Sequence, residues 1–164
     1  MNYWNRTILV GGLLGAVVVT ALIIAYNWRA TPRLEGQITE VRTLGMDASS
    51  SVAIVNFEAS NSSNYELSIN RREMAIVDQA GNPREGRILS VFDIQQLFQY
   101  FPALGGMRDE PLIDNKHLAP GESVRGLVAA RFEIPKHELD MRQEIVMRTM
   151  DNKNRRTALR LESE

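Results

Sequence analysis

The ten residues Ser51-Val-Ala-Ile-Val-Asn-Phe-Glu-Ala-Ser60 carry the clearest strand pattern in this sequence. Every second side chain shares one apolar face, which comprises Ala53, Val55, Phe57 and Ala59. Asn56 and Glu58 lie on the opposite face of the same stretch. An apolar period of two residues is typical of a strand that packs one face against a core. The pattern therefore predicts a β-strand within a packed domain.

Further strand patterns occur on both sides of this stretch, with polar turns between them. We expect strands over Gly36–Leu44, Tyr65–Asn70, Met74–Val77, Arg87–Phe92, Ser123–Phe132, Glu144–Met150 and Arg155–Leu161. Gly81-Asn82-Pro83 forms one turn, and Asp151–Asn154 joins the last two strands as a hairpin. About seven or eight short strands without repeated helices between them favour a mainly β fold, a β-sandwich, over an α/β fold. The domain is expected over residues 34–161, with a tail of residues 162–164.

One insertion interrupts the strands. Asp93 can cap a helix over Ile94–Phe101 that ends before Pro102, because apolar residues recur there at helical spacing: Ile94, Leu97, Phe98 and Phe101. Residues 103–120 then form a loop longer than compact domains usually carry. Two interpretations are open: the aromatic stripe packs over the open end of the sandwich, or the insertion contacts a partner or a bilayer surface. The candidate contacts are Leu97, Phe98, Phe101, Gly105 and Gly106.

A turn, a strand and a terminating proline follow one another in Leu118-Ala-Pro-Gly-Glu-Ser-Val-Arg-Gly126, then Val128, Phe132 and Ile134-Pro135. This stretch resembles the penultimate strand of bacterial immunoglobulin-like domains of unknown function. Such domains recur behind single membrane anchors or signal peptides and are similar to late-embryogenesis-abundant type 2 sandwiches. The resemblance implies an immunoglobulin-like β-sandwich. It carries over no catalytic residues, because these domains share none.

The N-terminal region has the pattern of a membrane anchor. Ile8–Ala25 contains 18 consecutive residues without a charge. A helix of that length spans about 27 Å, and extension through Trp28 matches the hydrocarbon thickness of about 30 Å. We expect a stub of residues 1–7, a transmembrane helix over residues 8–28 and a linker of residues 29–33. A cleaved secretory signal is the alternative, but the apolar run continues beyond the possible cleavage site at Ala21.

Small residues on one face of this segment predict helix packing within the membrane. They are Gly11, Gly12, Gly15 and Ala16, and such a face permits close approach of a second helix. The charge rule for orientation is nearly tied, with Arg6 before the segment and Arg29 and Arg33 after it. A short stub ahead of a β domain without cysteine or cofactor motif favours a cytoplasmic N-terminus. The expected location is the cell membrane, with the domain outside, in the periplasm.

Composition excludes several classes of function. The chain has 164 residues, a net charge of -1 and no cysteine, so a thiolate nucleophile and a cysteine-rich zinc site are ruled out. All acidic residues follow residue 33, which makes the domain mildly acidic and argues against nucleic acid as a partner. No phosphate loop, dinucleotide motif or nucleophile elbow occurs. We therefore predict no cofactor, no catalytic residues and no metal site; His117 beside Asp114 lacks the register of a calcium loop.

Basic residues cluster on the last hairpin. Arg155, Arg156 and Arg160 either form a solvated strand face or contact anionic headgroups or an acidic subunit.

The anchor pattern, the β domain and the absence of catalytic motifs together predict a single-pass, non-catalytic accessory or assembly subunit of a larger membrane protein complex. Its partners would be the lipid bilayer and other membrane-protein subunits. The alternative is an independent envelope-binding module for a small ligand, an ion or a polysaccharide. A third hypothesis is a hydrolase whose active site is assembled from residues far apart in the sequence.

Overall fold

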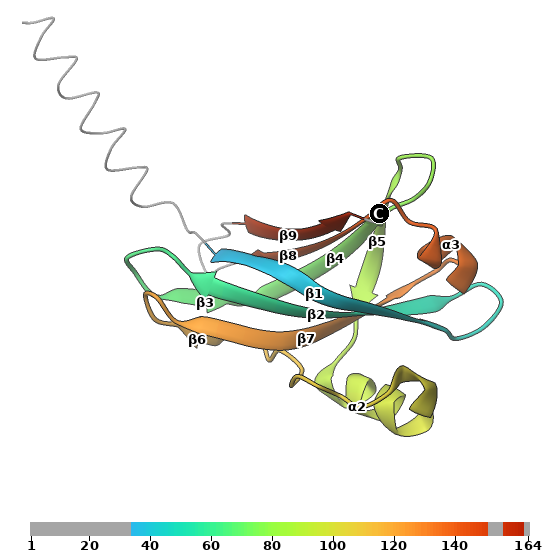
Figure 1. Cartoon of the computed structure of the whole chain (residues 1–164), viewed down its shortest axis with the longest axis horizontal. Coiled ribbons are helices and arrows are strands. Elements are labelled where there is room, and N and C mark those ends of the chain that lie inside the picture. Colours follow the sequence, from blue (N-terminus) through green and yellow to red (C-terminus); the bar gives the residue numbers. More distant parts are fainter. Residues whose placement is uncertain (1–33, 151–155, 163–164) are drawn as a thin grey trace, which may run out of the picture. The chain divides into compact units, whose positions relative to one another are not determined.

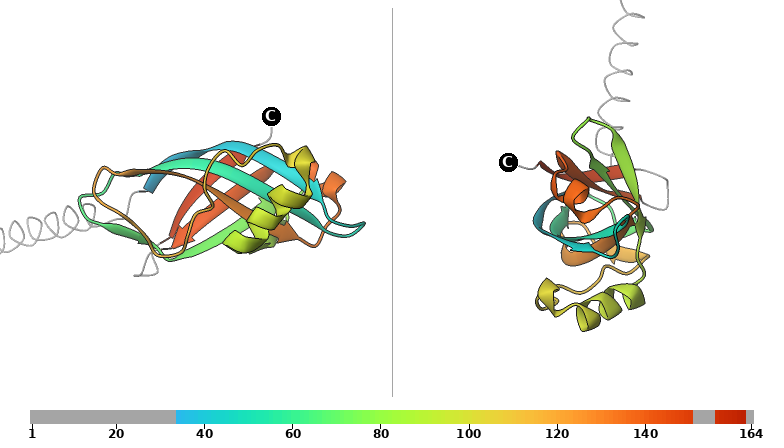
Figure 2. Two further views of the ribbon diagram at one scale, coloured as in Figure 1. Left: turned by 90° about the horizontal axis from the view of Figure 1, so that it is seen from below. Right: turned by 90° about the vertical axis from the view of Figure 1, so that its right-hand side faces the viewer.

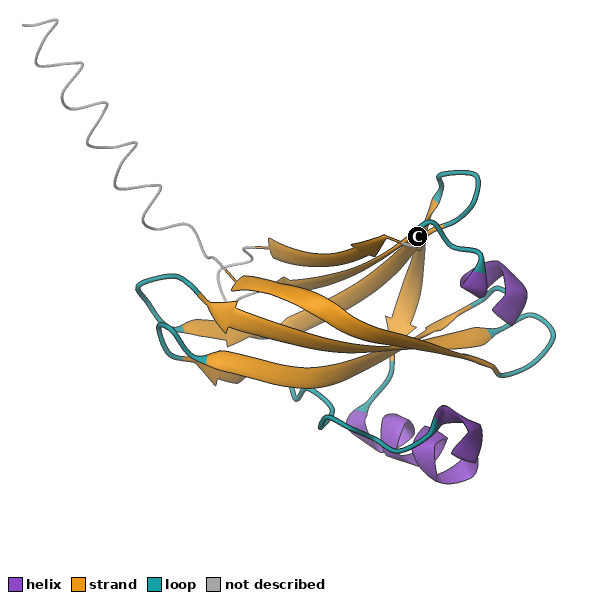
Figure 3. Ribbon diagram, viewed as in Figure 1, coloured by secondary structure: helices purple, strands orange, loops and turns teal. Residues whose placement is uncertain are grey.

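The computed structural model describes residues 34–150 and 156–162, which fold mainly into β-strands (Figure 3). The strands are β1 (Leu34–Gly45), β2 (Ser51–Asn61), β3 (Leu67–Ile69), β4 (Arg71–Val77), β5 (Pro83–Ile88), β6 (Lys116–Leu118), β7 (Ser123–Phe132), β8 (Glu144–Met150) and β9 (Arg156–Glu162). The helical elements in these ranges are α2 (Val91–Tyr100), the short 3-10 turn η1 (Pro102–Leu104) and α3 (Lys136–Asp140).

Seven strands form one antiparallel sheet in the order β1-β2-β7-β5-β4-β8-β9. The sheet curls so that β1, β2 and β7 lie across from β4, β8 and β9 (Figure 1). β5 passes between the two layers, because Pro83–Gly86 pair with β4 whereas Arg87 and Ile88 pair with β7. At this crossing a Cβ on Gly86 would lie 2.7 Å from the Phe132 ring, so the position requires a glycine. The predicted β-sandwich is confirmed in this layered form.

The main core fills the space between the layers. The face predicted from Ser51–Ser60 points into it, and all four of its residues belong to the core: Ala53, Val55, Phe57 and Ala59. Phe132 from the neighbouring strand β7 and Met147 from β8 in the opposite layer are equally buried and belong to the same cluster. Burial of a large apolar side chain contributes about 1.5–3 kcal/mol, so this cluster supplies the main driving force of the fold.

A second apolar cluster lies on the outer face of β2 and β7. Val52 and Ile54 from β2 and Leu127 from β7 are covered by Ile94 and Leu97 of α2. Figure 2 shows α2 lying across the outside of the sheet. The expectation that the helix packs over the open end of the sandwich is therefore wrong. β2 is buried on both faces, which explains why its apolar residues are continuous over Val52–Val55, before the alternation with Asn56 and Glu58 begins.

Two strand predictions need correction. The strand expected over Arg87–Phe92 is found at Pro83–Ile88, since the apolar residues after Ile88 lead into α2 instead. Lys116–Leu118 was expected within a loop but forms β6, which pairs with β3 in a separate two-stranded sheet. The hairpin turn predicted at Asp151–Asn154 lies outside the described residues.

Asn61, at the end of β2, ties three chain segments together. Its side-chain nitrogen donates hydrogen bonds to the carbonyl oxygens of Tyr65 at 2.8 Å, Leu118 at 2.9 Å and Ala119 at 3.2 Å. Its side-chain oxygen accepts from the backbone N–H of Ser63 at 3.0 Å. Asn61–Ser63 also matches the glycosylation pattern, but this amide is buried and its nitrogen is fully bonded in the fold.

The β1–β2 turn predicts a pH dependence. Hydrogen bonds from the Ser50 hydroxyl and then from Ser49 lower the pKa of Asp47 from 3.8 to about 2. A lowered folded-state pKa contributes stability that is present above the unfolded value and is lost as the pH falls through the folded value. We expect Asp47→Asn to remove this dependence between pH 3.8 and about 2. Denaturant unfolding of both proteins across that window measures it, and parallel stability curves would contradict it.

The predicted membrane segment lies outside the residues that the structure describes. Residues 8–28, including Gly11, Gly12, Gly15 and Ala16, are not among the described residues. Within residues 34–150 and 156–162, no helix has the length and apolar character needed to cross a membrane.

Candidate functional site

Helix α2 begins at a capping box placed directly after β5. The Ser90 hydroxyl accepts a hydrogen bond from the backbone N–H of Asp93 at 3.1 Å, and the Asp93 carboxylate accepts one from the backbone N–H of Ser90 at 3.2 Å. This reciprocal pair satisfies two donors that a first helical turn leaves free. The cap expected at Asp93 is therefore corrected to Ser90, and the helix starts earlier, at Val91.

The inner side of α2 packs on the sheet. Ile94 and Leu97 are buried in the outer cluster, and Phe98 and Phe101 are half-buried at its margin. The partner contacts predicted at Leu97, Phe98 and Phe101 thus fall on a side of the helix that the domain already covers in part. Packing within the chain accounts for the helical spacing of these residues.

The other side of α2 exposes aromatic residues that the sequence analysis missed. Phe92 is 65% exposed and Tyr100 is 67% exposed. With Gln96 between them they follow one another at intervals of four residues, which places all three along one side of the helix. We call Phe92, Gln96 and Tyr100 the outer stripe. Large exposed apolar side chains gathered in one place indicate an interaction surface.

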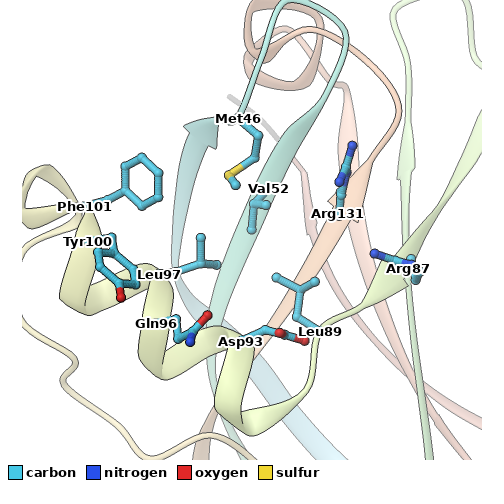
Figure 4. A pocket seen from close by; sticks show the side chains of 10 residues that line it. All are labelled: Met46, Val52, Arg87, Leu89, Asp93, Gln96, Leu97, Tyr100, Phe101 and Arg131. Atoms are coloured by element: carbon cyan, nitrogen blue, oxygen red, sulfur yellow. The ribbon is translucent and has the colours of Figure 1, made fainter.

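An open groove runs between α2 and the ends of β2, β5 and β7 (Figure 4). Its volume is about 270 Å³. The apolar lining comes from the helix, from the outer sheet face and from the β1–β2 turn: Met46, Val52, Leu89, Leu97, Tyr100 and Phe101. Tyr100 belongs to both the outer stripe and the groove, so the two features form one continuous surface. Pockets for drug-sized ligands usually measure about 300–1,000 Å³, and this groove lies at the lower limit.

Two arginines line the same groove. Arg87 on β5 and Arg131 on β7 are directly paired across the strands. Directly paired residues share a face of the sheet, and both side chains are drawn at the groove in Figure 4. Like charges opposite each other destabilise a sheet, so this pair does not serve the stability of the fold. The pairing of Arg87 with Arg131 follows from the register between β5 and β7, and this register could not be predicted from the sequence alone.

The two guanidinium groups have different surroundings. Arg131 Nε lies 3.3 Å from a Glu133 carboxylate oxygen without hydrogen-bond geometry, and Arg131 Nη2 lies 3.9 Å from Asp47. Arg87 is exposed, and within the described residues it has no ion pair. Asp93 also lines the groove, but its carboxylate is occupied by the Ser90 cap. The groove therefore presents one weakly compensated and one uncompensated cation beside apolar side chains.

Arg42 fastens the loop after α2 to the sheet. Its Nη1 donates to the carbonyl oxygens of Leu104 at 2.8 Å and Gly106 at 3.1 Å, and its Nη2 donates to Asn56 Oδ1 at 3.0 Å. The guanidinium also lies 5.0 Å from the centre of the Phe98 ring, within the range of a cation–π contact. Gly106, and with it the neighbouring Gly105, is thus held by the chain itself. The partner contact proposed for these glycines stays a prediction.

The basic residues of the last strand are only partly engaged. Arg160 Nη1 lies 3.2 Å from Glu144 on the neighbouring strand β8, and Arg156 is exposed. Arg155 lies outside the described residues. The ion pair with Glu144 agrees with a solvated strand face, and contact with an acidic partner remains untested.

The acidic and histidine residues considered for metal binding do not converge. Asp114 pairs with Arg72 at 2.6 Å, and His117 Nδ1 lies 2.6 Å from Glu66. His137 is exposed on α3. In the described ranges, no group of three or more His, Asp or Glu residues is arranged to hold a metal ion.

The comparisons with known proteins found neither a matching family model nor a matching curated protein. The chain is similar to solved structures at low identity. One is a candidate lipoprotein, YcdA, from Bacillus subtilis, with 11% identity, a TM-score of 0.47 and coverage of 80% of this chain and 38% of that one. Another is an uncharacterized β-sandwich protein from Clostridium difficile 630, with 10% identity, a TM-score of 0.35 and coverage of 79% and 86%.

A candidate ApaA protein from Bordetella pertussis is also similar, with 14% identity, a TM-score of 0.36 and coverage of 80% of this chain and 89% of that one. The chain spans less than half the length of YcdA. At these identities the similarities concern the β fold alone and assign no function. The function has to be argued from the surface formed by the outer stripe and the groove.

Proposed function

We propose that this chain is a membrane-tethered, non-catalytic accessory subunit whose sandwich docks onto a partner protein. The docking surface is the outer stripe together with the groove beside it. Residues 8–28 would hold the domain at the membrane, with the N-terminus in the cytoplasm and the domain outside. The anchor, this topology and the kinship with immunoglobulin-like domains remain predictions from the sequence.

One observation carries the proposal. Helix α2 packs one side on the sheet and carries two aromatic residues on its outer side that the domain does not cover. Ile94 and Leu97 complete the outer cluster, whereas Phe92 and Tyr100 stay 65% and 67% exposed. Aromatic residues are enriched among those that carry most of the energy of protein interfaces. An apolar surface on a rigid helix beside a groove supports the docking of a partner helix or segment.

Tethering strengthens such a contact. A second contact in the membrane, through Gly11, Gly12, Gly15 and Ala16, would make docking of the sandwich effectively intramolecular. Each contact can then be weak in isolation. An independent envelope-binding module for a small ligand is the second candidate. The groove supports it less, because it is open and its volume of about 270 Å³ is small for an enclosed ligand.

We expect Phe92→Glu with Tyr100→Glu to release the chain from its complex. Two aromatic anchors replaced by charges weaken an interface at least about 30-fold, the scale of one strong interface residue. The full chain is expressed in its native host, extracted with mild detergent and analysed by native electrophoresis with quantitative mass spectrometry. Wild type should run as a discrete high-mass species and the variant as free chain.

Gln95→Glu with Gln99→Glu is the matched control, because both glutamines are exposed on the same helix and neither belongs to the outer stripe. It adds the same charge and should leave the complex intact. Both double variants should unfold at the wild-type temperature, since they change exposed side chains. A wild-type chain that runs alone, or an aromatic variant that stays in the complex, would refute the proposed function.

A further inference from the structure

We infer that the groove binds an acidic segment of a partner protein, with a carboxylate between Arg87 and Arg131 and a neighbouring apolar side chain on the groove floor. This inference rests on the proposed function and specifies the chemistry that the docking surface selects. The two cations come from strands β5 and β7, and the floor comes from β2, from α2 and from Leu89 between β5 and α2.

The charge arrangement is the first argument. Arg87 and Arg131 face each other across two hydrogen-bonded strands, where repulsion between like charges costs stability. Within the described residues no carboxylate lies within ion-pair distance of Arg87, and Arg131 meets only Glu133 and Asp47, at 3.3 Å and 3.9 Å. A carboxylate placed between the two guanidinium groups would relieve the repulsion and accept hydrogen bonds from both.

The acidic neighbours select the kind of anion. Asp47, Asp93 and Glu133 all lie at the groove or beside Arg131. Their negative charge disfavours a phosphate, which carries more charge than a carboxylate, and therefore disfavours an anionic phospholipid headgroup or a nucleic acid. A carboxylate carries less charge than a phosphate and meets less of this repulsion, so it is the anion that can approach Arg87 most easily.

The apolar floor is the second argument. Val52, Leu89 and Leu97 line the groove next to the arginines, and Met46 and Tyr100 form its edges. A volume of about 270 Å³ accommodates a few side chains of a docked segment, and the open shape leaves room for its backbone to pass through. An apolar anchor next to Glu or Asp satisfies both parts of the groove at once.

Capped tripeptides test the inference directly. Ac-Leu-Glu-Phe-amide, Ac-Leu-Gln-Phe-amide and Ac-Ala-Glu-Ala-amide are titrated against the full chain in lipid nanodiscs, and binding is followed through the methyl NMR signals of Met46 and Leu97. We expect the Glu peptide to bind about fivefold more tightly than its Gln counterpart, the effect of one partly exposed ion pair. The peptide without apolar anchors should bind more weakly than either.

Arginine variants locate the effect. Arg87→Gln should abolish the preference for Glu over Gln, whereas Arg125→Gln, an exposed position on β7 outside the groove, should preserve it. Equal affinity of the Glu and Gln peptides, or no shift of the groove methyl signals up to about 10 mM peptide, would overturn the inference.

The complex assay described above distinguishes a failure of this inference from a failure of the proposed function. An assembled complex in which Arg87→Gln has no effect rejects the acidic segment alone, whereas an aromatic variant that still assembles rejects the docking surface.

Discussion

Asn61→Ala is expected to lower the free energy of unfolding by about 3–5 kcal/mol, because it leaves several buried polar groups without partners. The lost donors serve the carbonyl oxygens of Tyr65, Leu118 and Ala119, and the lost acceptor serves Ser63. Water cannot replace these bonds without opening the end of β2, since Asn61 is fully buried. Denaturant unfolding of the full chain, followed by far-ultraviolet circular dichroism, measures the change.

Asn64→Ala is the matched control, because Asn64 is exposed in the same loop. We expect it to stay within about 0.5 kcal/mol of wild type. Asn61→Asp separates the two halves of the amide: the acceptor for Ser63 remains, while the donors to three carbonyl oxygens are lost. Equal stability of the Asn61→Ala and Asn64→Ala proteins would show that this network does not hold the loops together.

Arg42→Ala is expected to detach the loop after α2 from the sheet. The variant loses the hydrogen bonds to Leu104 and Gly106, the bond to Asn56 and the contact with the Phe98 ring. We expect a loss of about 2–3 kcal/mol in the stability of this region, which appears as local opening before global unfolding. Hydrogen exchange of α2 and η1, measured by mass spectrometry, should be accelerated at least about tenfold.

Two further variants identify the cause. Arg108→Ala removes an arginine that is exposed and lies 3.6 Å from Glu40, and it should leave hydrogen exchange unchanged. Arg42→Lys keeps the charge but lacks the planar fork that reaches two carbonyl oxygens and Asn56 together, so it should restore only part of the protection. Unchanged exchange in Arg42→Ala would mean that the outer cluster alone holds the insertion in place.

Local sequence patterns predicted the strands and the helix well where one period dominates. The alternation in Ser51–Ser60 identified the core face of β2, and the spacing of Ile94, Leu97 and Phe98 identified the inner side of α2. The boundary before the helix was misplaced, since Ile88, Leu89 and their apolar neighbours also fit a strand. The deciding signal was the capping box of Ser90 and Asp93.

The site was harder to predict than the fold, because it depends on which segments meet. Val52 and Ile54 are apolar on the second face of β2, which already indicated that something covers that face, but not that α2 does. The pairing of Arg87 with Arg131 depends on the register between strands far apart in sequence. Phe92 and Tyr100 lie outside the apolar period of the helix, so periodicity gave no reason to select them.

The central place of β7 has a consequence for how the protein is made. β1 and β2 form a local hairpin early in synthesis, but β7, which joins β2 to β5, leaves the ribosome much later. Until then the free edge of β2 and both of its apolar faces are open to wrong pairing. Many non-local contacts also slow folding. The newly made chain is therefore most prone to aggregation until Ser123–Phe132 takes its place beside β2.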